Sequence, residues 1–156
     1  IRLRTFDPDR DVETVWRVDN TAFRDHWNAT DSTLEEFQHW LEKPCIRPEL
    51  WFLAEDEASG EVVGLGLNVI DPDYMAQTGR QEGYVDTIAV LRAYRRRGLG
   101  TALLAQSLQA LRQAGMEAAA LDADAENLTG ATRIYERMGF QVRKTGIAYQ
   151  KVLQKG

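Results

Sequence analysis

The sequence has few of the residues that build metal sites and cross-links. It contains one cysteine, Cys45, in 156 residues, so neither an internal disulfide nor a multi-cysteine zinc site can form. Its only histidines are His26 and His39, and with so few imidazole ligands we expect no metal ion. No apolar stretch approaches the ~20 residues of a membrane-spanning helix, and there is no signal-peptide pattern. We therefore expect a cytoplasmic protein.

The chain also lacks an excess of positive charge. It carries 24 Asp and Glu residues against 19 Lys and Arg residues, a formal net charge of −5. This balance argues against general binding to nucleic acid or to an anionic membrane, because both need a basic face. The length of 156 residues fits one domain, over 1–156. The chain begins at Ile1 rather than at methionine, as expected of a processed chain or of one half of a longer protein.

Hydrophobic periodicity and turn residues predict a mixed α/β domain (α+β, with a mixed sheet) of element order βααβββαβαββ. Ser32 and Glu35 have the spacing of a capping box at the start of the second helix. Residues 71–83 read as a polar loop. Trp16, Trp40 and Trp51 are expected in the core. In chain order the expected elements are strand 1–6, helix 7–27, helix 33–43, strands 50–56, 61–71 and 84–90, helix 98–114, strand 116–125, helix 127–140, and strands 140–144 and 147–153.

Positive charge is concentrated in one short stretch, RAYRRRGLG, over residues 92–100. It lies between a predicted strand and a predicted helix, where the first turn of the helix leaves backbone N–H groups unpaired and partly positive. Gly98 and Gly100 have no Cβ, so a phosphate can approach these donors closely. The stretch therefore indicates a polyphosphate site, although a solvated charged loop before a helix has the same appearance. The Walker pattern is absent, and the dinucleotide-binding fingerprint is incomplete.

The stretch Arg95–Gly100 after a strand, followed by Asn127 and by YERMGF over residues 135–140, resembles the GNAT superfamily of acyl-CoA-dependent N-acyltransferases. The order of elements is also similar, so the resemblance covers the whole domain. The stretches AFRDHW, WFLA, VDTIAV and TGATRIYERMGF look like the actinobacterial tandem group of that superfamily, which includes mycothiol synthase. Tandem members carry two such domains in one chain.

The resemblance implies acetyl-CoA as cosubstrate, with its pyrophosphate held mainly by backbone N–H groups of the arginine loop. The strand before the loop would pair with the pantetheine arm, and one N–H there would polarise the thioester carbonyl. Asn127 would hydrogen-bond the cosubstrate, a role compatible with capping its own helix. The implied cosubstrate-binding residues are Ile88, Ala89, Val90, Arg95, Arg96, Arg97, Gly98, Leu99, Gly100, Thr101 and Asn127.

Two residues are candidates for proton transfer. Tyr135 matches the family tyrosine that protonates the departing thiolate, and it also falls on an apolar helical stripe where a core residue would lie. Tyr84 stands where some family members have a glutamate base. Period-2 alternation places Glu82, Tyr84, Asp86 and Ile88 on one strand face, so Asp86 or Glu82 could act as the base through a water. Asp86 is the more unusual residue for a strand, and it could equally anchor a nearby arginine or a loop.

We therefore expect an N-acetyltransferase that transfers acetyl from acetyl-CoA to the primary amine of a small molecule or peptide, by direct attack in a ternary complex. His26 and Trp27 lie near the end of the first expected helix, where the resemblance implies an acceptor pocket, although a lone histidine is more often an ordinary surface or packing residue. In the loop over 71–83, Tyr74 and Met75 either line the same pocket or anchor the loop. A tandem domain or a homodimer is a compatible assembly. Two other functions fit the same sequence: a catalytically silent domain that binds CoA or stabilises a partner domain, and a nucleotide-binding regulatory module.

Overall fold

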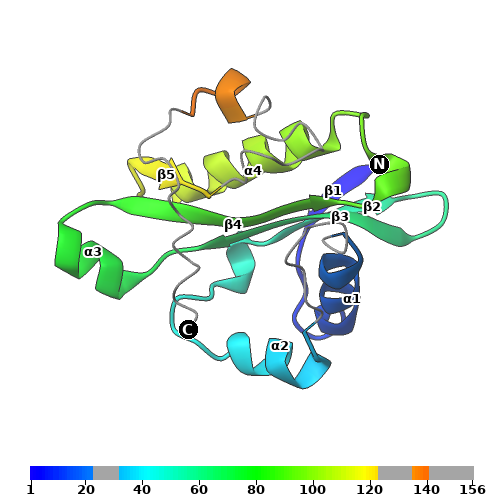
Figure 1. Ribbon diagram of the computed structural model, residues 1–156, viewed down its shortest axis with the longest axis horizontal. Helices are drawn as coiled ribbons and strands as arrows, with labels where there is room; N and C mark the ends of the chain where they lie inside the picture. Colours follow the sequence, from blue (N-terminus) through cyan, green and yellow to red (C-terminus); the bar gives the residue numbers. More distant parts are fainter. Residues whose placement is uncertain (23–31, 123–134, 141–156) are drawn as a thin grey trace, which may run out of the picture.

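A computed structural model describes residues 1–22, 32–122 and 135–140 of the chain. Its centre is a five-stranded sheet in the order β1-β2-β3-β4-β5, antiparallel except for the parallel pair β4 and β5 (Figure 1). The strands are β1 (Arg2–Thr5), β2 (Phe52–Asp56), β3 (Glu61–Val69), β4 (Glu82–Val90) and β5 (Ala118–Ala120). The observed sheet confirms the predicted mixed α/β class, including the short strand β5 in the alanine-rich stretch.

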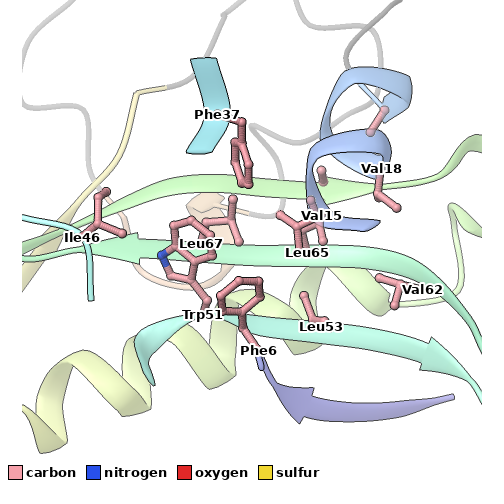
Figure 2. Packing of buried hydrophobic residues seen from close by; sticks show 12 residues of the cluster. Phe6, Val15, Val18, Phe37, Ile46, Trp51, Leu53, Val62, Leu65 and Leu67 are labelled. Atoms are coloured by element: carbon pink, nitrogen blue, oxygen red, sulfur yellow. The ribbon is translucent and has the colours of Figure 1, made fainter. Parts of the chain in front are cut away.

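Helices cover both faces of the sheet. Helices α1 (Val12–Ala22) and α2 (Leu34–Trp40) lie on one face, and α4 (Leu99–Gln113) lies on the other (Figure 1). Between the sheet and the first two helices is a core that includes Phe37, Trp51 and Leu67 (Figure 2). Trp51 is fully buried there, and Trp16 and Trp40 pack partly buried against the same core, as expected. We call this the α1-side core, and the cluster under α4 the α4-side core.

Helix α4 lies unusually close to the sheet because three glycines face it. A Cβ built on Gly64 would meet Leu103 at 3.0 Å, one on Gly66 would meet Ser107 at 3.1 Å, and one on Gly83 would meet Leu111 at 2.7 Å. These three contacts on α4 are spaced four residues apart, so they form one stripe along the helix. The glycines of β3 and β4 therefore set the distance and the direction of α4 across the sheet.

A β-bulge interrupts β4 at Asp86. Leu67 pairs with Thr87 and Asn68 pairs with Val85, so Asp86 is the extra residue. The bulge reverses the alternation of faces, and both Val85 and Ile88 pack against the α4-side core. The prediction that Glu82, Tyr84, Asp86 and Ile88 share one face is therefore wrong for Ile88, because periodicity cannot reveal a bulge.

Two further details of the fold differ from the sequence-based predictions. Residues 71–83 contain the helix α3 (Pro72–Thr78), which is capped by the Asp71 side chain and ended by the left-handed Gly79. None of its residues is buried, so it has no apolar stripe for periodicity to detect. The capping box of α2 is formed by Thr33 and Glu36, one residue later than predicted.

Short 3₁₀ helices at Pro48–Leu50 and Arg92–Tyr94 complete the described elements. The strands predicted over 140–144 and 147–153, and the start of the helix predicted over 127–140, lie outside the described residues. Within the described residues, no helix has both the length and the apolar character needed to cross a bilayer.

The close approach of α4 makes Gly83 a sensitive position. We expect Gly83→Ala to lower the free energy of unfolding by about 1–3 kcal/mol, because the new methyl group overlaps the buried Leu111 side chain. Urea denaturation would measure this change. In a Leu111→Ala background the same substitution should cost much less, since the obstructing side chain is gone. Equal costs in the two backgrounds would contradict the packing explanation.

Candidate active site

The strands β4 and β5 separate after a short paired segment and leave a fork. Parallel pairing joins Glu82–Tyr84 to Ala118–Ala120, and the rest of β4 has no partner on this side within the described ranges. At the end of β4 the N–H of Leu91 donates to the carbonyl of Val63 at 2.9 Å. Backbone groups alternate along a strand, so Ile88 and Val90 turn theirs into the fork, whereas Ala89 turns its N–H toward β3. Of the three predicted backbone contacts, the geometry favours Ile88 and Val90.

Arg95 connects the end of this open strand to another element. Its Nε donates to the carbonyl of Val90 at 2.9 Å, and its Nη2 donates to the carbonyl of Ala22 at 3.1 Å. The guanidinium therefore connects the end of β4 to the end of α1, two elements that are far apart in the sequence. A phosphate contact from Arg95 stays a prediction, and the structure gives this side chain a positioning role as well.

The start of α4 presents unpaired backbone donors beside two exposed arginines. Gly98, with φ of 81°, precedes the helix and provides no side-chain cap, and the first helical bond runs from Ala102 N–H to the Gly98 carbonyl. The N–H groups of Leu99, Gly100 and Thr101 consequently have no acceptor within the helix. Arg96 is itself left-handed, with φ of 66°, and the Arg97 guanidinium lies 4.9 Å from the centre of the Tyr94 ring. Helix dipole, open donors and two cations together suit a bound anion.

Tyr135 packs on the same side of the sheet as this helix. Its ring meets the Phe140 ring edge-on at 6.2 Å, and both rings pack against the α4-side core. Figure 1 shows residues 135–140 in orange on the α4 side of the sheet. Burial raises the pKa of the Tyr135 hydroxyl above its usual value, so at neutral pH the group carries a proton that it can donate. Tyr135 was predicted either as the general acid or as a core residue. Its half-buried position is compatible with both roles, because the ring packs while the hydroxyl keeps its proton.

Three carboxylates lie near the fork, on the α1 side of the sheet. Asp86 projects from the β4 bulge, Asp19 comes from α1, and Asp122 lies two residues after β5. The negative charge of Asp86, together with burial as the larger cause, raises the pKa of Asp19 to about 6. Burial, and then the charge of Asp122, raise the pKa of Asp86, while a 2.9 Å hydrogen bond from the Thr87 hydroxyl opposes this rise. Protein atoms limit the hydration of the Asp86 carboxylate although part of the residue reaches solvent.

Asp19 and Asp122 were missed by the sequence analysis. The only local signal for Asp19 is a carboxylate beside the buried Val18 on an amphipathic helix. The sequence around Asp122 contains no pattern that marks a site, because the place of this side chain in the fold depends on where β5 ends. Neither carboxylate is paired with a cation from the described ranges, and these residues include no group of three or more His, Cys, Asp and Glu side chains that could hold a metal ion.

Glu82, the other candidate base, is already engaged. It is buried, and its Oε1 accepts a 2.6 Å hydrogen bond from the Tyr74 hydroxyl on α3. This leaves Asp86 as the more available carboxylate on β4. The predicted residues Asn127, His26 and Trp27 lie outside the described residues.

The family model for acetyltransferases of the GNAT family matches residues 12–140, which include the fork, the arginine loop and Tyr135. The chain belongs to the GNAT acetyltransferase family. This membership confirms the predicted superfamily and the predicted fold.

Curated relatives of this GNAT domain include mycothiol acetyltransferases. The protein from Thermobispora bispora is 33% identical over 151 residues, which are 97% of this chain and 50% of that protein. The protein from Thermomonospora curvata is 34% identical over 151 residues, 96% of this chain and 47% of that protein. These matches confirm the resemblance to the group that includes mycothiol synthase. The chain spans about half the length of the curated relatives it matches.

Solved structures show the same GNAT fold. A GCN5-related N-acetyltransferase from Sphaerobacter thermophilus has a TM-score of 0.75 and 30% identity, over 91% of this chain and 41% of that chain. A GNAT family acetyltransferase from Brucella melitensis, solved in complex with acetyl-CoA, has a TM-score of 0.68 and 21% identity, over 90% of this chain and 82% of that chain.

The carboxylate pair predicts an unusual pH dependence of stability. The pKa of Asp19 rises from 3.8 to about 6 on folding, so the folded state binds this proton more tightly than the unfolded state does. The contribution of this group to stability is therefore complete below the unfolded pKa and is lost as pH rises through about 6. An asparagine at position 19 cannot ionise, so it would not lose stability as the pH rises.

We expect Asp19→Asn to raise the free energy of unfolding by about 1–3 kcal/mol at pH 8 and to leave it nearly unchanged at pH 3.5. Urea denaturation at the two pH values would measure the difference. Asp9→Asn, at an exposed carboxylate before α1, is the matched control and should show no such pH dependence. A stabilisation by Asp19→Asn that is the same at both pH values would contradict the charge explanation.

Proposed function

We propose that this domain transfers an acetyl group from acetyl-CoA to the primary amine of a small molecule, by direct attack in a ternary complex. The observation that carries the proposal is the fork between β4 and β5. Open backbone donors line it, a potential proton donor lies on the α4 side, and carboxylates lie on the α1 side. An amine can therefore approach from one face of the sheet while the thiolate leaves toward the other.

The start of α4 would bind the pyrophosphate of acetyl-CoA. The N–H groups of Leu99, Gly100 and Thr101 point out of the helix, and Arg96 and Arg97 add permanent positive charge. The pantetheine arm would then run along the open edge of β4 beside Ile88 and Val90. The carbonyl of Val90 already accepts from Arg95, which leaves the backbone of Ile88 and the N–H of Val90 for the ligand. In this arrangement the Ile88 N–H donates to the thioester carbonyl oxygen as negative charge develops there.

Asp86 and Tyr135 would move the two protons of the reaction. Asp86, as carboxylate, accepts a proton from the ammonium of the acceptor, directly or through a water, and the free amine then attacks the carbonyl carbon. When the carbon–sulfur bond breaks, Tyr135 donates its proton to the thiolate; the attacking nitrogen releases its second proton to water, and the tyrosinate regains a proton from water. The ordinary pKa values, about 10 for tyrosine and 8.5 for a thiol, make this transfer uphill by only ~2 kcal/mol. The burial that raises the pKa of Tyr135 also disfavours a thiolate beside it.

The acceptor that we propose is a small cationic amine. The curated relatives carry the name mycothiol acetyltransferase, which supports a small-molecule acceptor over a peptide. The carboxylates of Asp19, Asp86 and Asp122 favour an acceptor that arrives as an ammonium ion. A tandem domain, a homodimer and a cytoplasmic location stay predictions.

The function is tested by measuring acetyl transfer to a panel of small amines, with the free thiol released from acetyl-CoA as the signal. We expect turnover by the wild-type chain and a loss of ~10²-fold in kcat for Tyr135→Phe, the usual scale for losing a general acid. The ring and its contact with Phe140 remain in this variant, so the affinity for acetyl-CoA should change little. Unchanged turnover would make Tyr135 a packing residue. Binding of acetyl-CoA without turnover of any amine would contradict the proposed activity.

The pH dependence of turnover tests Asp86. We expect Asp86→Asn to lower kcat/KM by about 10- to 100-fold near neutral pH, and by less at high pH, where more acceptor is already free amine. In the wild type the carboxylate must be ionised to accept a proton, so activity should fall as pH drops through its pKa, which folding raises. Initial rates from about pH 5.5 to 9.5 would give both profiles. Glu82→Gln should keep the wild-type shape, and a pH-independent loss in Asp86→Asn would place the base elsewhere.

A further inference from the structure

A side-chain hydrogen bond joins the two branches of the fork where they separate. The hydroxyl of Tyr84 donates to Oδ2 of Asp122 at 2.8 Å. Tyr84 is the last residue of β4 that pairs with β5, and its partner there is Ala120. Asp122 lies two residues beyond Ala120, on the chain that leaves β5. The bond therefore connects the two chains just past their last backbone pairing.

Ionisation of the donor does not break this hydrogen bond near neutral pH. Burial is the largest cause that raises the pKa of the Tyr84 hydroxyl, and the bond to Asp122 and the charges of Asp122 and Asp86 raise it further. The hydroxyl consequently remains a protonated donor at neutral and mildly alkaline pH. Hydrogen bonds from a hydroxyl to an ionised carboxylate are among the stronger ones in proteins, so the contact can hold a geometry.

Within the described ranges, no strand pairs with β4 beyond Tyr84 on the fork side. The bulge at Asp86 lies two residues further on and lets β4 change direction there. Ile88, whose backbone faces the fork, follows the bulge, and the described ranges contain no strand beside it on that side. Among the described residues, the Tyr84–Asp122 bond is thus a side-chain restraint next to the bulge, and it ties residue 122, just past the end of β5, to β4.

We propose that Tyr84 and Asp122 form a positioning pair, whose hydrogen bond fixes the opening of the fork and so seats the acetyl-thioester end of acetyl-CoA against Ile88. The proposal rests on the proposed function. The pair acts through the separation of two chain segments, and it leaves the pyrophosphate site at the start of α4 unaffected.

Binding of two ligands separates this role from general stability. Acetyl-CoA reaches both the α4 start and the fork, whereas adenosine 3′-phosphate 5′-diphosphate carries only the nucleotide half. We expect Tyr84→Phe to weaken acetyl-CoA binding by about tenfold and to change binding of the nucleotide fragment by less than about twofold, as measured by calorimetry. Asp122→Ala should reproduce this ratio, and the double variant should add little, because one bond is lost in each case. Asp122→Asn should keep most of the affinity, since its amide oxygen still accepts from Tyr84.

Tyr74→Phe is the matched control. It removes another tyrosine–carboxylate hydrogen bond, which Tyr74 donates to Glu82 of β4 at 2.6 Å, away from the point where β4 and β5 separate. The affinities for acetyl-CoA and for the nucleotide fragment should both stay within about twofold of the wild-type values. The inference would be overturned if Tyr84→Phe left the ratio of the acetyl-CoA affinity to the nucleotide-fragment affinity unchanged, or if Tyr74→Phe changed that ratio equally. Either result would leave the proposed function standing. If Tyr84→Phe does not fold, Asp122→Ala at an exposed residue decides the question alone. A wild-type protein that does not bind acetyl-CoA would overturn the proposed function, and this inference with it.

Discussion

The close contact between α4 and the sheet is the constraint on which the rest of the structure depends. The helix rests on Gly64, Gly66 and Gly83, and a Cβ at any of the three would come within 3.1 Å of it. Because protein interiors are densely packed, a side chain at these positions would displace the helix rather than be absorbed. The resting position of α4 fixes its first turn next to the end of β4. The open N–H groups and the arginines consequently lie at one end of the fork.

Charge is distributed unevenly along this fork. The chain is acidic overall, with a formal net charge of −5, yet its arginine loop lies at the α4 start, and three carboxylates lie near the bulge of β4. An anionic ligand is attracted to the first region, and a cationic one to the second. This separation would suit the proposed reaction, because a polyphosphate-bearing donor and an ammonium acceptor would each be attracted to a different end of the fork.

The carboxylates of Asp19 and Asp86 act against stability. Burial and mutual repulsion disfavour their ionised forms, and no cation from the described ranges compensates them. Sequences usually avoid such conflicts, and those that persist are expected at functional sites. By contrast, Arg4 and Asp11 form a two-pronged ion pair with N–O distances of 2.8 and 3.0 Å, away from the fork, where the buried Asp11 carboxylate is fully compensated. The same chain thus pairs the buried Asp11 with a cation, whereas the half-buried Asp19 and the exposed Asp86 have no cation from the described ranges beside them.

Local sequence was enough to determine most elements, because amphipathic periodicity and turn residues act over a few neighbouring positions. It located α4 and the hairpin of β2 and β3, and the resemblance of the arginine loop and of residues 135–140 indicated the family. It failed at α3, which has no fully buried residue, and it put the capping box one residue early, since Ser32–Glu35 and Thr33–Glu36 offer the same chemistry. Only the tertiary structure decided the bulge at Asp86, the fork, and the meeting of Asp19, Asp86 and Asp122. These features depend on the register between strands and on the packing of separate elements, which no stretch of neighbouring residues specifies.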